Sequence, residues 1–180
     1  MNFSELFSTP QGTAAQIFGF IAMGIGLCMF AFRERKRILL FKMFANLTWV
    51  VHYTLLGAAS GAAINAINAV REGVFYHKDK KWASYIFWPF LFIAVNVGST
   101  VLSWQGAISL LPMLGSTINI IALWSSSTKR LRLVALPSQT LWLIYSIAVS
   151  SLPSTIFNAF SIVSLLWGMV RERFAGRRQA

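Results

Sequence analysis

Residues 49–68, WVVHYTLLGAASGAAINAIN, return 93 positions later as residues 142–161, WLIYSIAVSSLPSTIFNAFS. At this offset Trp49 falls on Trp142, and Asn65 falls on Asn158. Other matches at the same offset are Lys36 and Arg37 with Lys129 and Arg130, Leu40 with Leu133, His52 with Tyr145, and Val70 with Val163. Self-similarity at a fixed offset indicates that the chain contains two copies of one structural unit.

The composition indicates a membrane protein. Of 180 residues, 56% are hydrophobic and only 12% are charged, and the mean hydropathy is +0.61, too apolar for an ordinary soluble domain. A hydrocarbon core of about 30 Å is crossed by a helix of about 20 apolar residues. Seven runs with almost no charge come close to that length and predict spans at 13–32, 38–56, 61–76, 85–103, 107–125, 133–151 and 153–170.

The charged residues predict the orientation. The chain has 16 Lys and Arg against five Asp and Glu, a formal net charge of +11. Every cation lies in one of four segments, at 33–42, 71–81, 129–132 and 171–178, which alternate with connections that carry none. By the positive-inside rule the N-terminus is outside and the C-terminus is cytoplasmic. The net charge is therefore a topology signal, and we expect no nucleic-acid partner.

Repeat and topology together predict the architecture. Spans 1–3 recur as spans 5–7, and one extra span is needed between the copies to keep both in the same orientation. We expect an all-α integral membrane protein with seven transmembrane helices in a 3+1+3 parallel repeat. Residues 1–82 form the first three-helix repeat, 83–104 the linker helix, and 105–180 the second repeat with a basic cytoplasmic tail. Transporters built from such repeats bind their substrate near the bilayer midplane, between the repeats.

Polar and small residues follow helical stripes on these spans, and lipid offers such side chains no hydrogen-bond partner. We therefore expect the stripes to face protein or a cavity. On spans 2 and 6 they are Asn46, Trp49 and Tyr53 with Gln139, Trp142 and Ser146; on spans 3 and 7 they are Gly61, Asn65 and Asn68 with Ser154, Asn158 and Ser161.

The motif Trp-x-x-[His/Tyr], with Asn sixteen residues after the Trp, occurs once per repeat and resembles the SWEET and semiSWEET sugar transporters and the wider PQ-loop superfamily. Within that superfamily the likeness is strongest to the YgjV family of small bacterial inner-membrane proteins. The segments that carry it are Leu55-Leu56-Gly57, Asn65-Ala66-Ile67-Asn68 with Arg71, Leu110-Leu111-Pro112-Met113-Leu114-Gly115, and Trp142-Leu143-Ile144-Tyr145.

This resemblance implies a site, a mechanism and a location. In the SWEET family the paired Trp and Asn line the central sugar pocket, which places Trp49, Trp142, Asn65 and Asn158 there. Membrane-embedded prolines act as hinges in that family, and here they are Pro112 and Pro137. The first repeat has Gly19 and Phe44 at the equivalent positions, so Gly19 is the remaining hinge candidate. The expected location is the bacterial inner membrane.

Other roles stay open for several of these residues. His52, with its counterpart Tyr145, is a solute-binding candidate, and an intramembrane histidine serves either proton coupling or helix packing. Tryptophan at a span centre also packs against apolar neighbours, and intramembrane asparagine also joins helices by hydrogen bonds. Arg71 and Glu72 are interpreted as anchors at the cytoplasmic interface.

The predicted spans contain no acidic pair and no His or Cys cluster, so we expect neither catalysis nor a cofactor or metal. Aromatic faces and amides without a deep arginine or acid favour a small neutral polar solute such as a sugar, moved by facilitated diffusion. The lipid bilayer is the other expected partner, and a homo-oligomer remains open. Alternatives are a nucleoside or nicotinamide riboside transporter, an ion channel, or a non-transporting membrane interaction or sensor protein.

Overall fold

The computed structural model describes residues 7–32, 34–124 and 128–177, and within these it is a bundle of helices without strands. The described residues do not include residues 1–6 and 178–180, which belong to the outer ends of the two predicted repeat units. They also do not include residue 125, the last residue of the fifth predicted span. The elements are α1 (Pro10–Cys28), η2 (Met29–Ala31), α2 (Arg35–Leu55), α3 (Ala59–Tyr76), α4 (Lys81–Ser84), α5 (Phe87–Leu102), η3 (Ala107–Ser109), α6 (Leu110–Trp124), α7 (Thr128–Ala148) and α8 (Leu152–Arg177).

Each predicted span overlaps one helix of the structure, namely α1, α2, α3, α5, α6, α7 or α8. Among the described residues, three helices are long and apolar enough to cross a membrane, namely α1, α2 and the Leu152–Val170 part of α8. Three further apolar helices are shorter, at Phe87–Leu102, Ala107–Ile121 and Val134–Ala148. The protein is thus an apolar helical membrane protein, and helix α3 differs from the rest because Arg71 and Glu72 lie in its second half.

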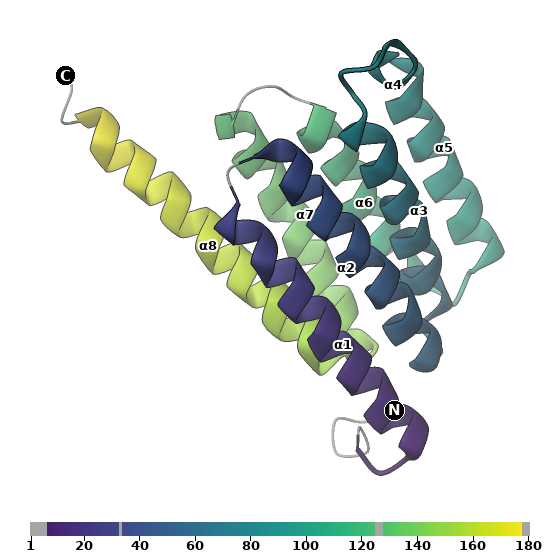
Figure 1. Ribbon diagram of the computed structural model, residues 1–180. Coiled ribbons are helices and arrows are strands. Elements are labelled where there is room, and N and C mark those ends of the chain that lie inside the picture. Colours follow the sequence, from purple (N-terminus) through teal and green to yellow (C-terminus); the bar gives the residue numbers. More distant parts are fainter. Residues whose placement is uncertain (1–6, 33, 125–127, 178–180) are drawn as a thin grey trace.

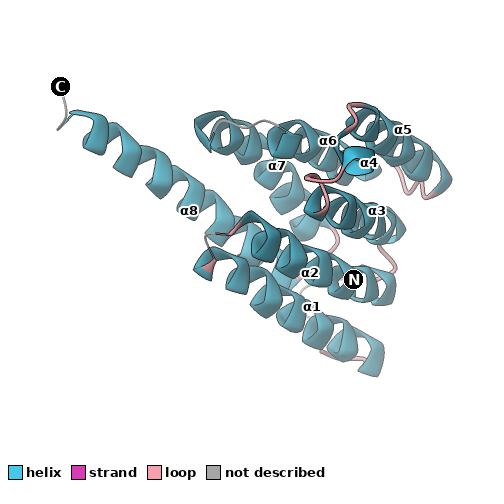
Figure 2. Cartoon of the chain, turned by 45° about the horizontal axis from the view of Figure 1, so that its top comes forward, coloured by secondary structure: helices cyan, strands magenta, loops and turns pink. Residues whose placement is uncertain are grey.

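The helices form two neighbouring groups. Helix α2 packs between α1 and α3, and α7 packs between α6 and α8. The groups meet where α1 contacts α8 and where α3 contacts α6, two contacts that are equivalent under the 93-residue offset. Helix α5 lies at one edge of the bundle against α3 and α6 (Figures 1 and 2). At its C-terminal end α8 projects beyond the other helices (Figure 1).

The offset also reproduces helix boundaries. Helices α2 and α7 both have 21 residues, and Arg35 and Thr128, their first residues, are 93 positions apart. Helices α3 and α8 likewise begin 93 positions apart, at Ala59 and Leu152. Helices α2 and α7 therefore start and stop in the same register, and α3 and α8 start in it, although the sequences of the two copies differ.

The turn that follows α2 recurs after α7 in backbone detail. Gly57 and Ser150, again 93 positions apart, have φ angles of 71° and 56°. Each turn is closed by three hydrogen bonds from a backbone amide to a backbone carbonyl, at equivalent positions. In the first turn the amides of Leu56, Gly57 and Ala58 donate to the carbonyls of His52, Thr54 and Tyr53, at 3.1, 3.0 and 2.9 Å. In the second turn the amides of Val149, Ser150 and Ser151 donate to the carbonyls of Tyr145, Ile147 and Ser146, at 3.0, 3.1 and 2.8 Å. This left-handed helix C-cap suits glycine and strains serine.

Replacing Ser150 by glycine is expected to raise the free energy of unfolding by about 1 kcal/mol, because an L-residue in the left-handed region is penalised by roughly that amount. Thermal unfolding of the purified protein in detergent measures the effect. The reciprocal change, Gly57→Ser, introduces the same strain into the first turn and should destabilise to a similar extent. Shifts of the same sign in both variants would contradict this explanation.

Candidate functional site

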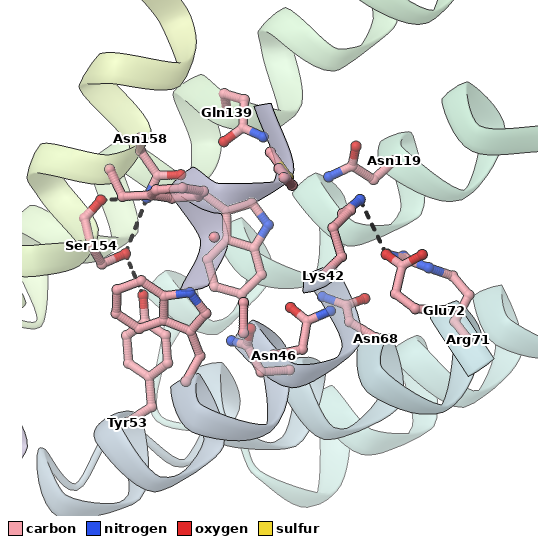
Figure 3. A pocket seen from close by; sticks show the side chains of 17 residues that line it. Lys42, Asn46, Tyr53, Asn68, Arg71, Glu72, Asn119, Gln139, Ser154 and Asn158 are labelled. Carbon is pink, nitrogen blue, oxygen red and sulfur yellow. Dashed lines mark hydrogen bonds and ion pairs between the residues drawn. The ribbon is translucent and has the colours of Figure 1, made fainter. Parts of the chain in front are cut away.

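A cavity of about 120 Å³ lies between the two groups of helices, with room for several water molecules or a small solute. Its walls come from α1, η2, α2 and α3 on one side and from α6, α7 and α8 on the other, while α5 contributes no lining residue. Figure 3 shows this cavity from close by. Both copies of the repeated unit therefore contribute to one shared cavity.

Four of the predicted site residues line this cavity: Trp49, Trp142, Asn65 and Asn158. The two indoles are 6% and 8% exposed, so neither is turned out toward lipid. Their rings lie 5.9 and 6.2 Å from that of Tyr53, which also lines the cavity. The two tryptophans thus belong to one aromatic cluster that borders the central space.

The two asparagines are held in the same way. Asn65 Nδ2 donates to the carbonyl of Gly61, and Asn158 Nδ2 donates to the carbonyl of Ser154, each at 2.8 Å. Because a carbonyl can only accept, the amide nitrogen of each asparagine is turned toward its own helix. The two amide oxygens accept no hydrogen bond from the described residues, so they remain as acceptors for a group in the cavity.

His52 does not line the cavity and lies buried between the two groups of helices. Its Nδ1 is 2.6 Å from the carbonyl of Ala15, which fixes the proton on that nitrogen. Its Nε2 is 2.6 Å from Ser151 Oγ and therefore accepts the hydroxyl proton. Both ring nitrogens are satisfied within the protein, an arrangement that favours the packing role over proton coupling.

Tyr145, the counterpart of His52, also lies outside the cavity lining. Its hydroxyl accepts from the Gly61 amide at 2.8 Å and lies 3.1 Å from Ser60 Oγ. In the opposite direction, Tyr53 in α2 contacts Ser154 in α8 through their hydroxyls at 2.7 Å. The two groups of helices are therefore joined by reciprocal hydrogen bonds at the end where their turns lie.

The hinge candidates occupy three different settings. Gly19 is in the middle of α1, where an added Cβ would lie 2.7 Å from His52 Nδ1 and 2.8 Å from Pro153 Cγ. Pro112 lies in the first turn of α6, where a missing amide proton leaves no helical hydrogen bond unmade. Pro137 is inside α7, a position that interrupts the helical hydrogen bonds. Whether these positions bend during function stays a prediction.

A charged cluster also borders the cavity, formed by Lys42, Arg71 and Glu72. Arg71 is 2% exposed and Glu72 is 0% exposed, so the interpretation of both as interface anchors is wrong. Glu72 Oε1 accepts from Arg71 at 2.9 Å and lies 3.1 Å from Lys42 Nζ. The expectation of a pocket without a deep arginine or acid is therefore wrong as well.

Polar residues from neighbouring helices hold the arginine in place. Arg71 donates to Ser116 Oγ in α6 at 3.3 Å. The same hydroxyl donates to Asn68 Oδ1 at 2.5 Å and accepts from Asn96 Nδ2 of α5 at 3.1 Å. This network pairs the charged residues inside the protein. Such pairing offsets the free-energy cost of burying an arginine in an apolar surrounding.

The stripes already visible in the sequence lead to this cluster. Lys42 stands four residues before Asn46 and seven before Trp49, and Glu72 stands four after Asn68 and seven after Asn65. These spacings place each charged residue on the same helix face as the predicted site residues. Extending each predicted stripe by one helical turn would have identified Lys42 and Glu72 as residues of the same cavity wall.

Comparisons with known proteins agree with the membrane character of the chain. The sequence profile of Imp-YgjV, described as a bacterial inner membrane protein, matches residues 13–175. The chain is similar to the inner membrane protein YgjV of Escherichia coli (strain K12), with 26% identity over 144 residues, 80% of this chain and 76% of the relative. No solved structure matches the chain at a significant level. The protein is located in the bacterial inner membrane, and the chain belongs to the Imp-YgjV family.

Proposed function

We propose that the protein is a membrane transporter that binds a small polar solute in the cavity between two three-helix units, with no catalytic step. The observation that carries this proposal is the placement of Trp49, Trp142, Asn65 and Asn158, two pairs at equivalent positions, around one cavity. A site shared by two equivalent units is the arrangement expected of a repeat-built transporter. The proposal includes seven spans in a 3+1+3 arrangement, an outside N-terminus and membership of the SWEET and PQ-loop superfamily.

The lining favours a solute that has a flat or ring-shaped body and several hydrogen-bond donors. Indole faces pack well against rings, and the amide oxygens of Asn65 and Asn158 accept from hydroxyl or N–H groups. Asn46, Asn119 and Gln139 add further amides to the walls. A sugar has this character, and so does a nucleoside.

The hydrogen bonds between the two units suggest how access is controlled. The contacts of Tyr145 with Gly61, of His52 with Ser151 and of Tyr53 with Ser154 close the end near the turns. The opposite end is bordered by Lys42, Met29 and Arg71. In the proposed orientation the cytoplasmic side is the accessible one, and exchange of the closing hydrogen bonds would open the other side. We propose facilitated diffusion as the mechanism.

A panel of sugars, nucleosides and related neutral solutes tests the proposal, with thermal stabilisation of the purified protein as the readout of binding and uptake into proteoliposomes as the readout of transport. Asn65→Ala and Asn158→Ala should each weaken binding of the stabilising solute by about fivefold, the equivalent of one neutral hydrogen bond.

Gln105→Ala provides a matched control. Gln105 Nε2 also donates to a backbone carbonyl, that of Gly57 at 2.8 Å, but the side chain lies outside the cavity lining. Its removal should leave solute affinity unchanged. Equal losses in all three variants would contradict the proposed site, and insensitivity to every solute would favour a non-transporting interaction or sensor role.

A further inference from the structure

The charges in the cavity wall belong to one repeat unit only. Lys42, Arg71 and Glu72 come from α2 and α3. Their counterparts 93 residues later carry no charge and are Ala135, Ser164 and Leu165. In Figure 3 the charged side chains lie at one side of the cavity, and Tyr53, Ser154 and Asn158 lie at the other. The cavity is therefore nearly symmetric in its aromatic and amide groups and asymmetric in charge.

This cluster has one positive charge in excess, since two cations share a single carboxylate. Both contacts converge on the same oxygen, Glu72 Oε1, at 2.9 Å from Arg71 and 3.1 Å from Lys42. An unbalanced charge inside an apolar protein is unfavourable unless a counter-charge is near. The described residues that line the cavity include no second acid.

Donors remain for such a counter-charge. The Lys42 ammonium has three donors, and its side chain is 22% exposed, the most accessible of the three charged groups. Arg71 Nε is buried without a hydrogen-bond partner among the described residues. Asn46 and Asn119 also line the cavity and make no hydrogen bond with described residues through their side chains. An anionic group beside Lys42 would meet the unused donors of the ammonium and of the Asn46 and Asn119 amides.

We propose that Lys42 and Arg71 form an anion-binding end of the cavity, so that the solute carries a carboxylate in addition to a polar or aromatic body. This inference rests on the proposed transport function and specifies its substrate class. A single negative charge neutralises the cluster, whereas a phosphate monoester, with close to two, would exceed it. The carboxylate end lies against the first repeat, and the body extends toward Trp49, Trp142 and the two asparagines.

Matched sets of probes test the proposal on the purified protein. Each set shares its body and differs in the acid: glucose with glucuronate and glucose 6-phosphate, benzyl alcohol with benzoate, and, as a phosphate comparison alone, uridine with uridine monophosphate. The carboxylate member is expected to stabilise the protein at a concentration about tenfold lower than the neutral member needs, since a hydrogen bond to a charged group contributes more than a neutral one. The phosphate arms separate a preference for one negative charge from a general preference for anions.

Four variants test which residues produce the preference for a carboxylate. Lys42→Gln should remove the carboxylate preference, and Lys42→Arg should keep it. Glu72→Gln should increase affinity for the carboxylate, because the acid that competes for both cations is neutralised; a merely structural role for this cluster does not predict that sign. Lys36→Gln removes the same charge from α2 at an exposed ion pair with Asp79, Nζ to Oδ2 3.1 Å, and should behave as the parent protein does.

A second readout does not depend on an identified solute. Iodide and caesium both quench tryptophan fluorescence, and the difference between the parent protein and the variant Trp49→Phe/Trp142→Phe isolates emission from the cavity. With each quencher scaled to its effect on free tryptophan, iodide should quench this emission more than caesium does, and Lys42→Gln, unlike Lys36→Gln, should remove the preference. This readout decides the question if no pair binds.

The outcomes separate the two proposals. Neutral members that bind and are transported at least as well as their carboxylates would overturn the anion-binding end and leave the transport proposal standing. A stronger preference for phosphates than for carboxylates would overturn the single-charge assignment. Absence of binding by every member, together with equal quenching by iodide and caesium, would overturn this inference and the proposed function together.

Discussion

Glu72→Ala is expected to lower the free energy of unfolding by about 3–5 kcal/mol, the usual result of removing one partner from a buried ion pair. Glu72 is completely buried, and its Oε1 is the acceptor for both Arg71 and Lys42. Its removal leaves two cations in an apolar surrounding without a counter-charge. Thermal and denaturant-induced unfolding in detergent measure the loss.

The ion pair between Glu34 and Arg37 is a matched control. Its distance is 2.8 Å, close to that of the buried pair, but both side chains are more than half exposed. Glu34→Ala should therefore change stability by only about 0–1 kcal/mol. Similar losses in the two variants would mean that burial has no special effect on the inner pair.

The double variant Arg71→Met/Glu72→Leu gives a further check. Because it removes the uncompensated guanidinium along with the acid, it should recover part of the stability lost in Glu72→Ala. Acetate added to Glu72→Ala should also restore part of it by supplying a carboxylate to Lys42 and Arg71. A double variant less stable than the single one would contradict the charge-balance explanation.

Gly61→Ala is the second substitution with a large expected effect, a destabilisation of about 1–3 kcal/mol, typical of overpacking. An added Cβ would lie 2.7 Å from both Cε1 and the hydroxyl of Tyr145. The ring would have to move, and the 2.8 Å hydrogen bond from the Gly61 amide would be lost or weakened. Unfolding in detergent again gives the measurement.

Gly24→Ala is the corresponding control, because at that position of α1 a Cβ would have no atom within 4 Å beyond its chain neighbours and the backbone of its own helix. Alanine there should be neutral or stabilising by up to about 1 kcal/mol, since it favours the helix. In a Tyr145→Ala background the loss caused by Gly61→Ala should largely disappear. A loss that persists without the ring would assign the effect to the backbone of α3 instead.

The sequence was sufficient to predict the features that depend on local pattern. The offset between Trp49 and Trp142 predicted equivalent helices, and helical spacing predicted that both indoles and both asparagines belong to inward-facing stripes. The structure places these four side chains around one cavity. Such features follow from periodicity because they need only the helix geometry and the rule that lipid excludes polar groups.

Features that depend on pairing between distant segments could not be predicted in this way. Arg71 and Glu72 stand near the end of a predicted span, where charged residues ordinarily reach the interface. Their burial depends on Lys42 from α2 and Ser116 from α6, partners that no one-dimensional pattern identifies. The same holds for His52, whose ring is satisfied by Ala15 and Ser151.

The one-sided charge of the cavity has a consequence for the covalent connection between the two units. In a dimer of identical three-helix chains, every residue of the wall would occur twice, and a lysine, an arginine and a glutamate would become six charged groups around a space of about 120 Å³. Because the two copies are joined through α5 in one chain, they can differ in sequence. The first copy carries the three charged residues, and the second has Ala135, Ser164 and Leu165 at the equivalent positions. The cavity of a tandem chain can therefore bind a solute in one preferred orientation, which the cavity of a two-fold symmetric dimer cannot do.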